Sequence, residues 1–411
     1  MRCGLLGEKL GHSYSPQIHS LLGTYRYDLI EKTPQEAEAF LRHGDFDALN
    51  VTIPYKKLAL QCCAEVTDRA SRIGSVNTIV RRADGTLFGD NTDYDGFAYM
   101  LTQSKIDVSG RKVLVLGSGG ASLTVQAVLR DLGASVVVIS RGGPDNYQNL
   151  SRHSDASVIV NTTPVGMYPN NGKSPINFAE FPDCIGVLDL IYNPARTKLL
   201  QDAAARGIPY AGGLTMLVAQ GRRAAERFTG QSIPVTETDR IVRILQDEME
   251  NIILIGMPGS GKSTAGRALA ALLHRPFYDA DAELVRSAGR SIPEIFAAEG
   301  ETGFRARETE ILAEYGKKSG IILATGGGCV TRPENEPLLR QNGRIVWLMR
   351  DWHTLPTDGR PLSQTSNLAE MERVRRPMYK QFADISVEVS TDPAETAARI
   401  ASRLMLQHDA N

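Results

Sequence analysis

Two segments of the sequence combine an apolar strand, a glycine-rich turn and the start of a helix, an arrangement that binds phosphate through backbone N–H groups. The first, from Lys112 to Ser122, contains Gly117-Ser118-Gly119-Gly120-Ala121. The second, from Ile252 to Thr264, contains Gly256-Met257-Pro258-Gly259-Ser260-Gly261-Lys262-Ser263-Thr264. Only the second has the lysine and hydroxyl of a nucleoside-triphosphate loop. The two loops are therefore expected to bind different nucleotides, and the chain is expected to contain two enzymes.

The second loop predicts phosphoryl-transfer chemistry. The amide groups of residues 259–263 are expected to cradle the β-phosphate of ATP, Lys262 to bridge the β- and γ-phosphates, and Ser263 to bind Mg²⁺. The segment Phe277-Tyr278-Asp279-Ala280-Asp281 is predicted to end the next strand. Alternation along a strand would place Asp279 and Asp281 on the same side, one in the metal shell and one on a substrate hydroxyl.

The first loop has the pattern of a dinucleotide site. Sites that prefer NAD place an acidic residue at the end of the second strand, where it binds the ribose 2′-hydroxyl. Here the strand Val136–Ile139 is followed by Ser140 and Arg141. An arginine at this place suits the 2′-phosphate of NADP, to which it can donate forked hydrogen bonds. The alternative is an arginine that only caps the strand end on the surface.

Polar groups in the first hundred residues could complete a reductase. Ser13 and Ser15 offer two hydroxyls on one side of a segment expected to be extended, which could anchor a carboxylate or hydroxyl group. Lys56 stands at a predicted strand-to-helix junction and could protonate a ketone oxygen as hydride arrives, with Asp93 as its partner. Taken singly, Lys56 is more typical of a solvated surface lysine and Asp93 of a turn-forming residue.

Several motifs occur together and in one order: Ser13/Ser15, Asn50-Val51-Thr52-Ile53-Pro54-Tyr55-Lys56, Ser75-Val76-Asn77-Thr78, Gly89-Asp90-Asn91-Thr92-Asp93, the glycine loop, Asn161-Thr162-Thr163-Pro164, Asp189 to Pro194, and Gly212 to Gln220. This order resembles the shikimate dehydrogenase family over residues 1 to about 248. The resemblance implies NADPH-dependent reduction of 3-dehydroshikimate, with Lys56 and Asp93 handling the proton. It also assigns Ser13, Ser15, Thr52, Asn77, Asp93, Tyr192 and Gln220 to the substrate, and Gly117, Gly119, Gly120, Ala121, Ser140, Arg141, Thr162 and Gly213 to the cofactor.

Further motifs follow the triphosphate loop: Gly303-Phe304-Arg305, Ala324-Thr325-Gly326-Gly327-Gly328, Gly359-Arg360-Pro361-Leu362 and Arg375-Arg376-Pro377. Together they resemble the shikimate kinase family over residues 250–411. The resemblance implies that Asp279 belongs to the metal shell and that Asp281 orients the 3-hydroxyl of shikimate. It further implies that Arg305 and Arg375 bind the substrate carboxylate, that Gly326, Gly327 and Gly328 admit its ring, and that Arg360 reaches the phosphates from a lid.

The elements needed to position these groups are those of α/β folds. We expect a substrate-binding domain over residues 1–102, completed by a return helix over about 220–249. A Rossmann-type NADP-binding domain is expected over 103–219, and a P-loop kinase domain with a parallel sheet over 250–411. The expected strands include Ala48–Ile53, Val113–Leu116, Val136–Ile139, Val158–Val160, Val187–Leu190 and Ile252–Ile255.

Composition excludes some partners. The chain has 411 residues, of which 42% are apolar and 23% charged, and its net charge is -1. A dispersed and nearly balanced charge gives no case for nucleic acid. No apolar run approaches the roughly 20 residues that cross a bilayer, and no signal peptide is recognised, so a cytoplasmic location without membrane contact is expected. The oligomeric state is left open.

These expectations combine into one hypothesis, since the product of the first reaction is the substrate of the second. The chain is expected to reduce 3-dehydroshikimate with NADPH and then to phosphorylate shikimate with ATP and Mg²⁺. Two alternatives stay open. A shikimate-sensing regulator derived from such enzymes is disfavoured because Lys56, Asp93, Lys262 and Asp281 are all retained. A reductase that also accepts quinate can be separated only by kinetics.

Overall fold

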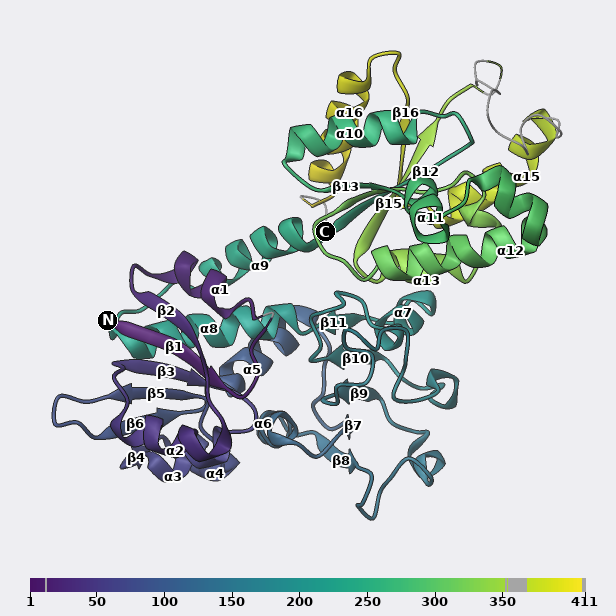
Figure 1. Ribbon diagram of the computed structural model, residues 1–411. Coiled ribbons are helices and arrows are strands. Elements are labelled where there is room, and N and C mark those ends of the chain that lie inside the picture. The colour runs from purple at the N-terminus through teal and green to yellow at the C-terminus, as the bar shows by residue number, and fades with distance from the viewer. Residues whose placement is uncertain (12, 352, 354–367, 409–411) are drawn as a thin grey trace. The chain divides into compact units, whose positions relative to one another are not determined.

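The computed structural model describes residues 1–11, 13–351, 353 and 368–408, with side chains described to residue 404. The chain divides into two compact units, Met1–Leu245 and Gln246–Asn411. The division falls within helix α9 (Thr236–Met249). Each unit is an α/β structure, as Figure 1 shows, so the predicted fold class is confirmed.

The first unit begins with a mixed six-stranded sheet in the order β2-β1-β3-β5-β6-β4. Strand β1 pairs in parallel with β2 and β3, whereas β5 runs antiparallel to β3 and β6. Helices α1 to α4 separate the early strands along the chain. The bounds are β1 Arg2–Gly7, α1 Ser15–Leu22, β2 Arg26–Glu31, α2 Pro34–His43, β3 Ala48–Val51, α3 Lys56–Cys62, β4 Glu65–Val66, α4 Asp68–Ile73, β5 Thr78–Arg81 and β6 Leu87–Asp90.

One strand of this sheet is shorter than the sequence predicts. The strand expected over Ala48–Ile53 ends at Val51. The Tyr55 amide donates to the Thr52 carbonyl over 2.9 Å and so closes a turn. Pro54, which has no N–H group, could not continue the ladder. Thr52 therefore lies in a turn at the strand end, directly before α3.

The second sheet of this unit has five parallel strands in the order β11-β10-β9-β7-β8. Its strands β9 and β10 are buried along their whole length and apolar up to their last residues, Asn161 and Asp189, as expected for a parallel sheet covered by helices on both faces. Apolar clusters cover each face, one around Val113 and Val125 and another around Leu114 and Phe181. The bounds are β7 Lys112–Leu116, α6 Gly120–Asp131, β8 Ser135–Ile139, β9 Val158–Asn161, β10 Gly186–Asp189, α7 Lys198–Ala205 and β11 Tyr210–Gly212.

Two long helices connect the sheets of the first unit. Helix α5 (Asp93–Ser104) packs along α8 (Leu214–Thr229). Helix α8 also contacts β5 of the first sheet, and α5 contacts β11 of the second. After the second sheet the chain thus returns to the first sheet through α8, which begins before the return helix expected from about residue 220.

The second unit has a five-stranded parallel sheet in the order β13-β14-β12-β15-β16. Strand β12 is central and fully buried, with an apolar cluster on each face. The bounds are β12 Asn251–Ile255, α10 Lys262–Leu273, β13 Phe277–Asp279, α11 Ala280–Ala288, α12 Ile292–Tyr315, β14 Ile322–Ala324, α13 Asn335–Arg340, β15 Gly343–Met349, α15 Leu368–Phe382, β16 Ile385–Glu388 and α16 Pro393–His408.

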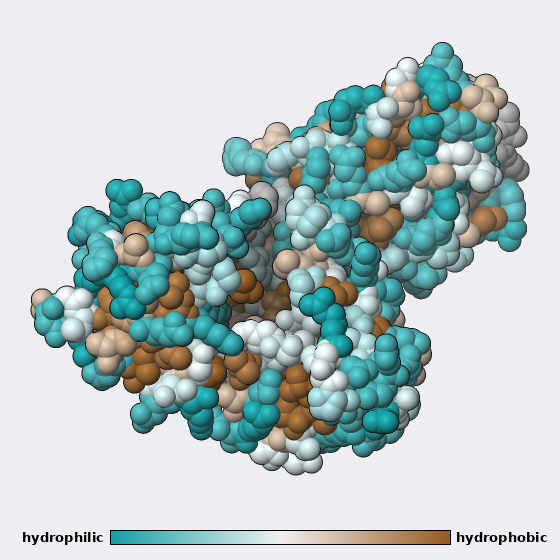
Figure 2. Space-filling view, turned by 60° about the horizontal axis from the view of Figure 1, so that its bottom comes forward, coloured by the Kyte–Doolittle hydropathy of each residue, from teal (hydrophilic) through white to brown (hydrophobic). Residues whose placement is uncertain are grey.

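The face of the molecule that is drawn in Figure 2 is largely hydrophilic. In Figure 2 apolar side chains form separate groups among hydrophilic ones. Among the residues that the structure describes, no helix is both long and apolar enough to cross a membrane.

Candidate active sites

The structure brings together the acid–base pair expected in the first unit. Lys56 is the first residue of α3, and Asp93 is the first residue of α5. The Lys56 Nζ lies 2.5 Å from the Asp93 Oδ2, although the residues are 37 positions apart. The side chains are only 16% and 11% exposed. Two helix starts, one after β3 and one after β6, thus hold an ammonium against a carboxylate with little access to water.

The two serine hydroxyls are neighbours, but the segment that carries them is not extended. The Ser13 hydroxyl donates to the Ser15 hydroxyl over 3.1 Å, and the Ser15 amide donates to Ser13 Oγ. Ser15 already belongs to α1, because Pro16 favours the first turn of a helix. The extended conformation predicted here is therefore wrong. Tyr192 packs edge-to-face on Tyr14 with ring centroids 5.9 Å apart, which joins the loop after β10 to this segment.

Other residues assigned to the substrate lie on elements around this pair. Asn77 is 3% exposed and follows α4, directly before β5. Gln220 lies on α8 where it packs most closely on α5, since a Cβ at Gly96 would be 2.9 Å from the Gln220 Cβ. Thr52 contacts β1, because a Cβ at Gly7 would lie 2.8 Å from its methyl group. Their contacts to a substrate remain predictions.

The first glycine loop has the open space that a ligand needs. Gly117 adopts φ 105°, a conformation that favours glycine, and a Cβ there would be 2.8 Å from the Thr162 hydroxyl. At Gly119 and Gly120, where α6 starts, a Cβ would meet no atom within 4 Å. Ala121 follows in the first turn. The exposed N-terminus of α6 therefore fits an anionic group.

The residues around this loop are fixed by backbone contacts. The Thr162 hydroxyl donates to the Leu116 carbonyl over 2.7 Å. A Cβ at Gly213 would lie 2.0 Å from the Leu190 carbonyl oxygen, so α8 begins against the end of β10 only because residue 213 is glycine. After β8, the Ser140 amide donates to the Asp145 carbonyl over 3.1 Å and closes a turn in which Arg141 is exposed. Recognition of a 2′-phosphate by Arg141 remains a prediction.

The triphosphate loop of the second unit connects β12 to α10. Gly256, Gly259 and Gly261 have φ angles of 147°, 81° and 92°, a region that favours glycine. Lys262 is 8% exposed, and its Nζ donates to the carbonyls of Gly256 and Met257, each over 2.9 Å. The loop backbone thus surrounds the Lys262 side chain. Ser260 lies in the loop, and Ser263 and Thr264 lie in the first turn of α10.

Two carboxylates adjoin this loop, but they come from different elements. Asp279 ends β13 and caps α11 by accepting from the amides of Asp281 and Ala282. It also accepts from the Ser263 hydroxyl over 2.5 Å. Asp281 lies in the first turn of α11, so the prediction that strand alternation aligns both carboxylates is wrong. The capping role of Asp279 ends the strand before Asp281.

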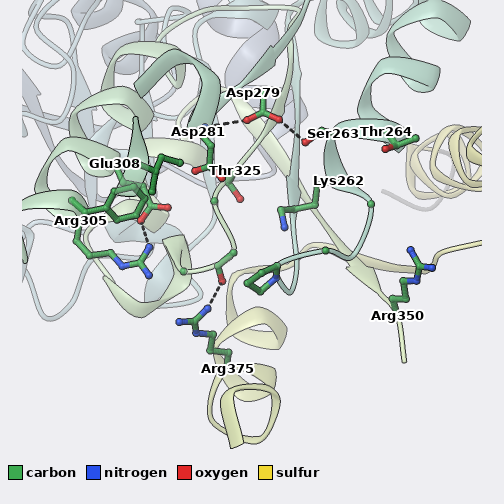
Figure 3. Close-up of a pocket in the computed structure, with 18 of the residues that line it drawn as sticks. Lys262, Ser263, Thr264, Asp279, Asp281, Arg305, Glu308, Thr325, Arg350 and Arg375 are labelled. Atoms are coloured by element: carbon green, nitrogen blue, oxygen red, sulfur yellow. Dashed lines mark hydrogen bonds and ion pairs between the residues drawn. The ribbon is translucent and has the colours of Figure 1, made fainter. Parts of the chain in front are cut away.

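Charged groups gather around Asp281. Burial and the negative charges of Glu308 and Asp279 raise its pKa to about 6, against the opposing effect of Lys262 and Arg305. The Arg305 Nη1 donates to the Glu308 carboxylate over 2.7 Å, with both side chains nearly buried. Arg375 donates to the Gly327 carbonyl over 3.1 Å. Figure 3 shows Arg305 and Arg375 near one end of the pocket, and Lys262 with Ser263 toward the other.

Three successive glycines separate these ends. A Cβ at Gly326 would lie 2.2 Å from Glu308, one at Gly327 would lie 2.6 Å from Pro258, and one at Gly328 would lie 2.1 Å from Arg305. Packing alone requires glycine at position 327, where the Pro258 backbone nitrogen would lie 2.7 Å away, whereas a Cβ at Gly326 or Gly328 would have to displace the end of the Glu308 or Arg305 side chain. Whether a substrate ring also approaches this backbone remains a prediction.

These groups line a single cavity of about 510 Å³, a size typical of small-ligand sites. Of the predicted residues, Gly259, Gly261, Lys262, Ser263, Thr264, Asp279, Asp281, Arg305, Gly326, Gly327, Gly328 and Arg375 line it. Sequence reasoning missed further lining residues, among them Ile292, Phe296, Glu308, Thr325 and Arg350. Glu308 could have been found from its helical spacing of three from Arg305. Arg360, predicted for the lid, lies outside the described residues.

Comparison with known proteins yields two families. The family model described as shikimate dehydrogenase substrate binding domain matches residues 5–79, and that of shikimate kinase matches residues 258–405. Shikimate dehydrogenase (NADP(+)) of Clostridium perfringens is 34% identical over 265 residues, covering 59% of this chain and 97% of that protein. Shikimate kinase of Thioalkalivibrio sulfidiphilus is 45% identical over 165 residues, covering 38% of this chain and 87% of that protein.

A solved structure agrees with the first of these families. Shikimate 5-dehydrogenase from Thermus thermophilus, in complex with NADP(H) and shikimate, matches with a TM-score of 0.55 and 31% identity. The match covers 59% of this chain and 99% of that one.

Proposed function

The chain belongs to the shikimate dehydrogenase family through its N-terminal part and to the shikimate kinase family through its C-terminal part, and on this premise we propose two successive reactions. The first is reduction of 3-dehydroshikimate to shikimate with NADPH. The second is phosphorylation of shikimate to shikimate 3-phosphate with MgATP. The observation that carries the proposal is the pairing, in one chain, of the Lys56–Asp93 contact with a cavity that joins a triphosphate loop to two arginines.

In the proposed reduction, NADPH supplies the hydride to the carbonyl carbon. The Lys56 ammonium gives a proton to the carbonyl oxygen, so that the ketone becomes a secondary alcohol. Asp93 holds the ammonium in place through its 2.5 Å contact. Ser13 and Ser15 would bind the substrate carboxylate, while Thr52, Asn77, Tyr192 and Gln220 would contact the ring and its hydroxyls.

The dinucleotide fits the open N-terminus of α6. The space beside Gly119 and Gly120 allows a pyrophosphate to approach the backbone. Arg141, exposed after β8, would bind the 2′-phosphate and thus select NADPH over NADH. Thr162 and Gly213 would border the nicotinamide end, where β7, β9 and β10 finish.

In the proposed phosphorylation, ATP supplies the γ-phosphoryl group. Asp281 would accept the proton of the 3-hydroxyl, while Arg305 and Arg375 fix the carboxylate at the opposite side of the ring. Lys262 would leave its backbone carbonyls and neutralise charge on the β- and γ-phosphates. The hydroxyl of Ser263 and the carboxylate of Asp279 are oxygen donors of the kind that Mg²⁺ binds, with its other ligands from phosphate and water.

One assay tests both reactions. The purified chain is given 3-dehydroshikimate, NADPH and MgATP, and NADPH loss and ADP formation are followed together. We expect both signals, with ADP delayed because shikimate must first form. Omitting NADPH should abolish both signals. A chain that only senses shikimate would bind it and give neither signal, and replacing 3-dehydroshikimate by 3-dehydroquinate reveals any quinate activity.

Two single substitutions separate the sites. Lys56→Ala should lower the reductase kcat by roughly 100-fold or more, the usual scale for a positioned proton donor, and leave shikimate phosphorylation unchanged. Lys262→Ala should abolish ADP formation and leave NADPH oxidation unchanged. Loss of both activities in either variant would contradict two independent sites.

A further inference from the structure

The orientation of one amide, that of Asn77, is fixed by the protein. The backbone N–H of Thr92 points to the Asn77 Oδ1 over 2.7 Å. A backbone N–H can only donate, so the side-chain atom facing it must be the amide oxygen. The Asn77 NH₂ group is therefore directed away from Thr92. The backbone donor thus settles which side-chain atom is oxygen and which is nitrogen.

Two hydroxyls reinforce this orientation. The Thr78 hydroxyl lies 3.1 Å from the Asn77 Oδ1, and the Thr92 hydroxyl lies 3.2 Å from it. The hydroxyls are also 2.9 Å from each other. Since a carbonyl oxygen has two lone pairs, these donors occupy its capacity. Within the described part of the chain, the Asn77 Nδ2 makes no hydrogen bond, so only its N–H groups are left for a ligand.

The Thr78 hydroxyl is itself held from the other side by Asn50. The Tyr27 hydroxyl donates to the Asn50 Oδ1 over 2.8 Å, which turns the Asn50 NH₂ toward the Thr78 hydroxyl, 3.3 Å away. Tyr27 in turn stacks on the buried His19, with ring centroids 4.0 Å apart. Asn50, Thr78 and Thr92 are at most 4% exposed. A buried series of donors therefore runs from β2 across the sheet to Asn77.

The same contact also fixes the start of α5, the helix that carries the Asp93 member of the acid–base pair. Thr92 directly precedes Asp93, and its amide is the group held by Asn77. Hydrogen bonds thus join Asn77 to the start of α5, since the Asn77 backbone N–H also donates to the Asp90 carbonyl over 3.1 Å. Lys56 adds a further donor next to Asp93.

We propose that Thr92, Thr78, Asn50 and Tyr27 are positioning residues that lock Asn77 as a hydrogen-bond donor, so that the reductase site selects a ring hydroxyl able to accept from Asn77. This inference rests on the proposed reductase function. It adds a specificity rule that the identity of the site residues alone does not provide. A substrate group that faces the Asn77 NH₂ and can only donate a hydrogen bond is rejected, because Asn77 cannot turn its amide oxygen toward that group.

The test uses the full chain without ATP and follows NADP⁺ reduction with shikimate and with deoxy analogues that each lack one non-reacting ring hydroxyl. The variants are Thr92→Val, Tyr27→Phe and Asn77→Asp, with Thr92→Ser as the conservative variant. We expect Thr92→Val to lower kcat/KM for shikimate by roughly 3- to 10-fold, the scale of one hydrogen bond, mainly through KM. Thr92→Ser should restore it, and Tyr27→Phe should act in the same direction with a smaller loss.

The decisive measurement is the ratio of kcat/KM for shikimate to kcat/KM for each deoxy analogue. For one analogue, the one without the hydroxyl that Asn77 binds, the Thr92→Val and Asn77→Asp losses in kcat/KM should disappear. The preference for shikimate over this analogue should therefore shrink roughly 3- to 10-fold in Thr92→Val, which keeps the backbone N–H, and fall toward one in Asn77→Asp, which removes the donor. Thr67→Val is the matched control, because its hydroxyl donates to Asp90 in the same region without contacting Asn77. It should leave every ratio unchanged.

The inference would be overturned if the variants lost the same factor of kcat/KM with shikimate and with every analogue. The hydrogen bonds would then only stabilise the fold. Should Thr92→Val not fold, the Asn77→Asp and Tyr27→Phe ratios decide the same question. If the unaltered chain does not reduce NADP⁺ with shikimate, it is the proposed function that fails.

Discussion

Asp281 is the carboxyl group whose surroundings bear most directly on phosphoryl transfer. Burial and the charges of Glu308 and Asp279 raise its pKa to about 6. Only the ionised carboxylate can accept the proton of a substrate hydroxyl. The kinase kcat should therefore rise with pH through a midpoint near 6 and fall as the carboxylate is protonated below it.

The contribution of Glu308 to this pKa can be tested by Glu308→Gln. Removing a negative charge favours ionisation of Asp281, so the acid limb of kcat against pH should move to lower pH. Glu301→Gln is the matched control, because Glu301 also contacts Arg305, over 3.4 Å, but its side chain is 56% exposed. The control should leave the midpoint in place. An unmoved or raised midpoint in Glu308→Gln would contradict Asp281 as the titrating group.

The nucleotide preference of the reductase is also a single-residue prediction. Arg141→Asp replaces a group that can form charge-assisted hydrogen bonds of about 1.5 to 3 kcal/mol with one that repels a phosphate. The ratio of kcat/KM for NADPH to that for NADH should fall roughly 10- to 100-fold. Arg152→Asp, an equivalent change at an exposed arginine further along the chain, should have a smaller effect. An unchanged ratio in Arg141→Asp would mean that other residues read the 2′-phosphate.

At the scale of elements, the sequence was sufficient to predict those features in which a residue type has only one structural use. Apolar runs ending in glycine turns predicted both parallel sheets and both loops. The sequence did not predict correctly where a strand ends and a helix begins. Asp281 was placed on a strand because Asp279 and Asp281 alternate, whereas Asp279 caps a helix. The surroundings of Asn77 could not be predicted either, because Thr92 contacts it directly, and Tyr27 acts on it through Asn50, only by buried hydrogen bonds between residues far apart in the sequence.

The junction of β10 and α8 depends on one glycine. In Gly213→Ala the new Cβ would lie 2.0 Å from the Leu190 carbonyl, a backbone atom that cannot turn aside. Helix α8 should shift, and with it Gln220, so the reductase KM should rise several-fold and the first unit should lose stability on the scale of about 1 to 3 kcal/mol. Kinase activity of the same chain is the internal control. Wild-type reductase kinetics would show that the helix start tolerates the added methyl group.

At the scale of the whole molecule, the two sites have separate supports. The reductase residues lie in the first compact unit and the kinase cavity in the second. The expected domain boundary near Met249–Glu250 remains a proposal, and the division found in the structure lies earlier in α9, after Leu245. Hydrogen bonds explain why residues 246–249, at the end of α9, belong to the second unit. The Gly320 amide donates to the Met249 carbonyl over 2.8 Å, and Arg275 donates to the carbonyls of Asp247 and Glu250.

These contacts predict how the chain can be cut. A piece of residues 246–411 keeps all three carbonyls, whereas a piece of residues 250–411 loses those of Asp247 and Met249 and leaves Arg275 and Gly320 with fewer acceptors. At about 0.5 to 1.5 kcal/mol for each hydrogen bond, the shorter piece should be less stable by roughly 1 to 3 kcal/mol. For a domain of this size that corresponds to a Tm lower by roughly 2 to 12 °C.

Both pieces should phosphorylate shikimate, since the loop and the cavity lie beyond residue 250. Thermal unfolding of the two pieces, each with and without ATP, measures the difference directly. Replacing Arg275 by methionine in the longer piece should also lower its Tm, because the carbonyls of Asp247 and Glu250 then lack their donor while the Gly320–Met249 hydrogen bond remains. Equal Tm values for the two pieces would show that the end of α9 contributes nothing to the kinase unit, and an inactive longer piece would show that the kinase fold requires residues before 246.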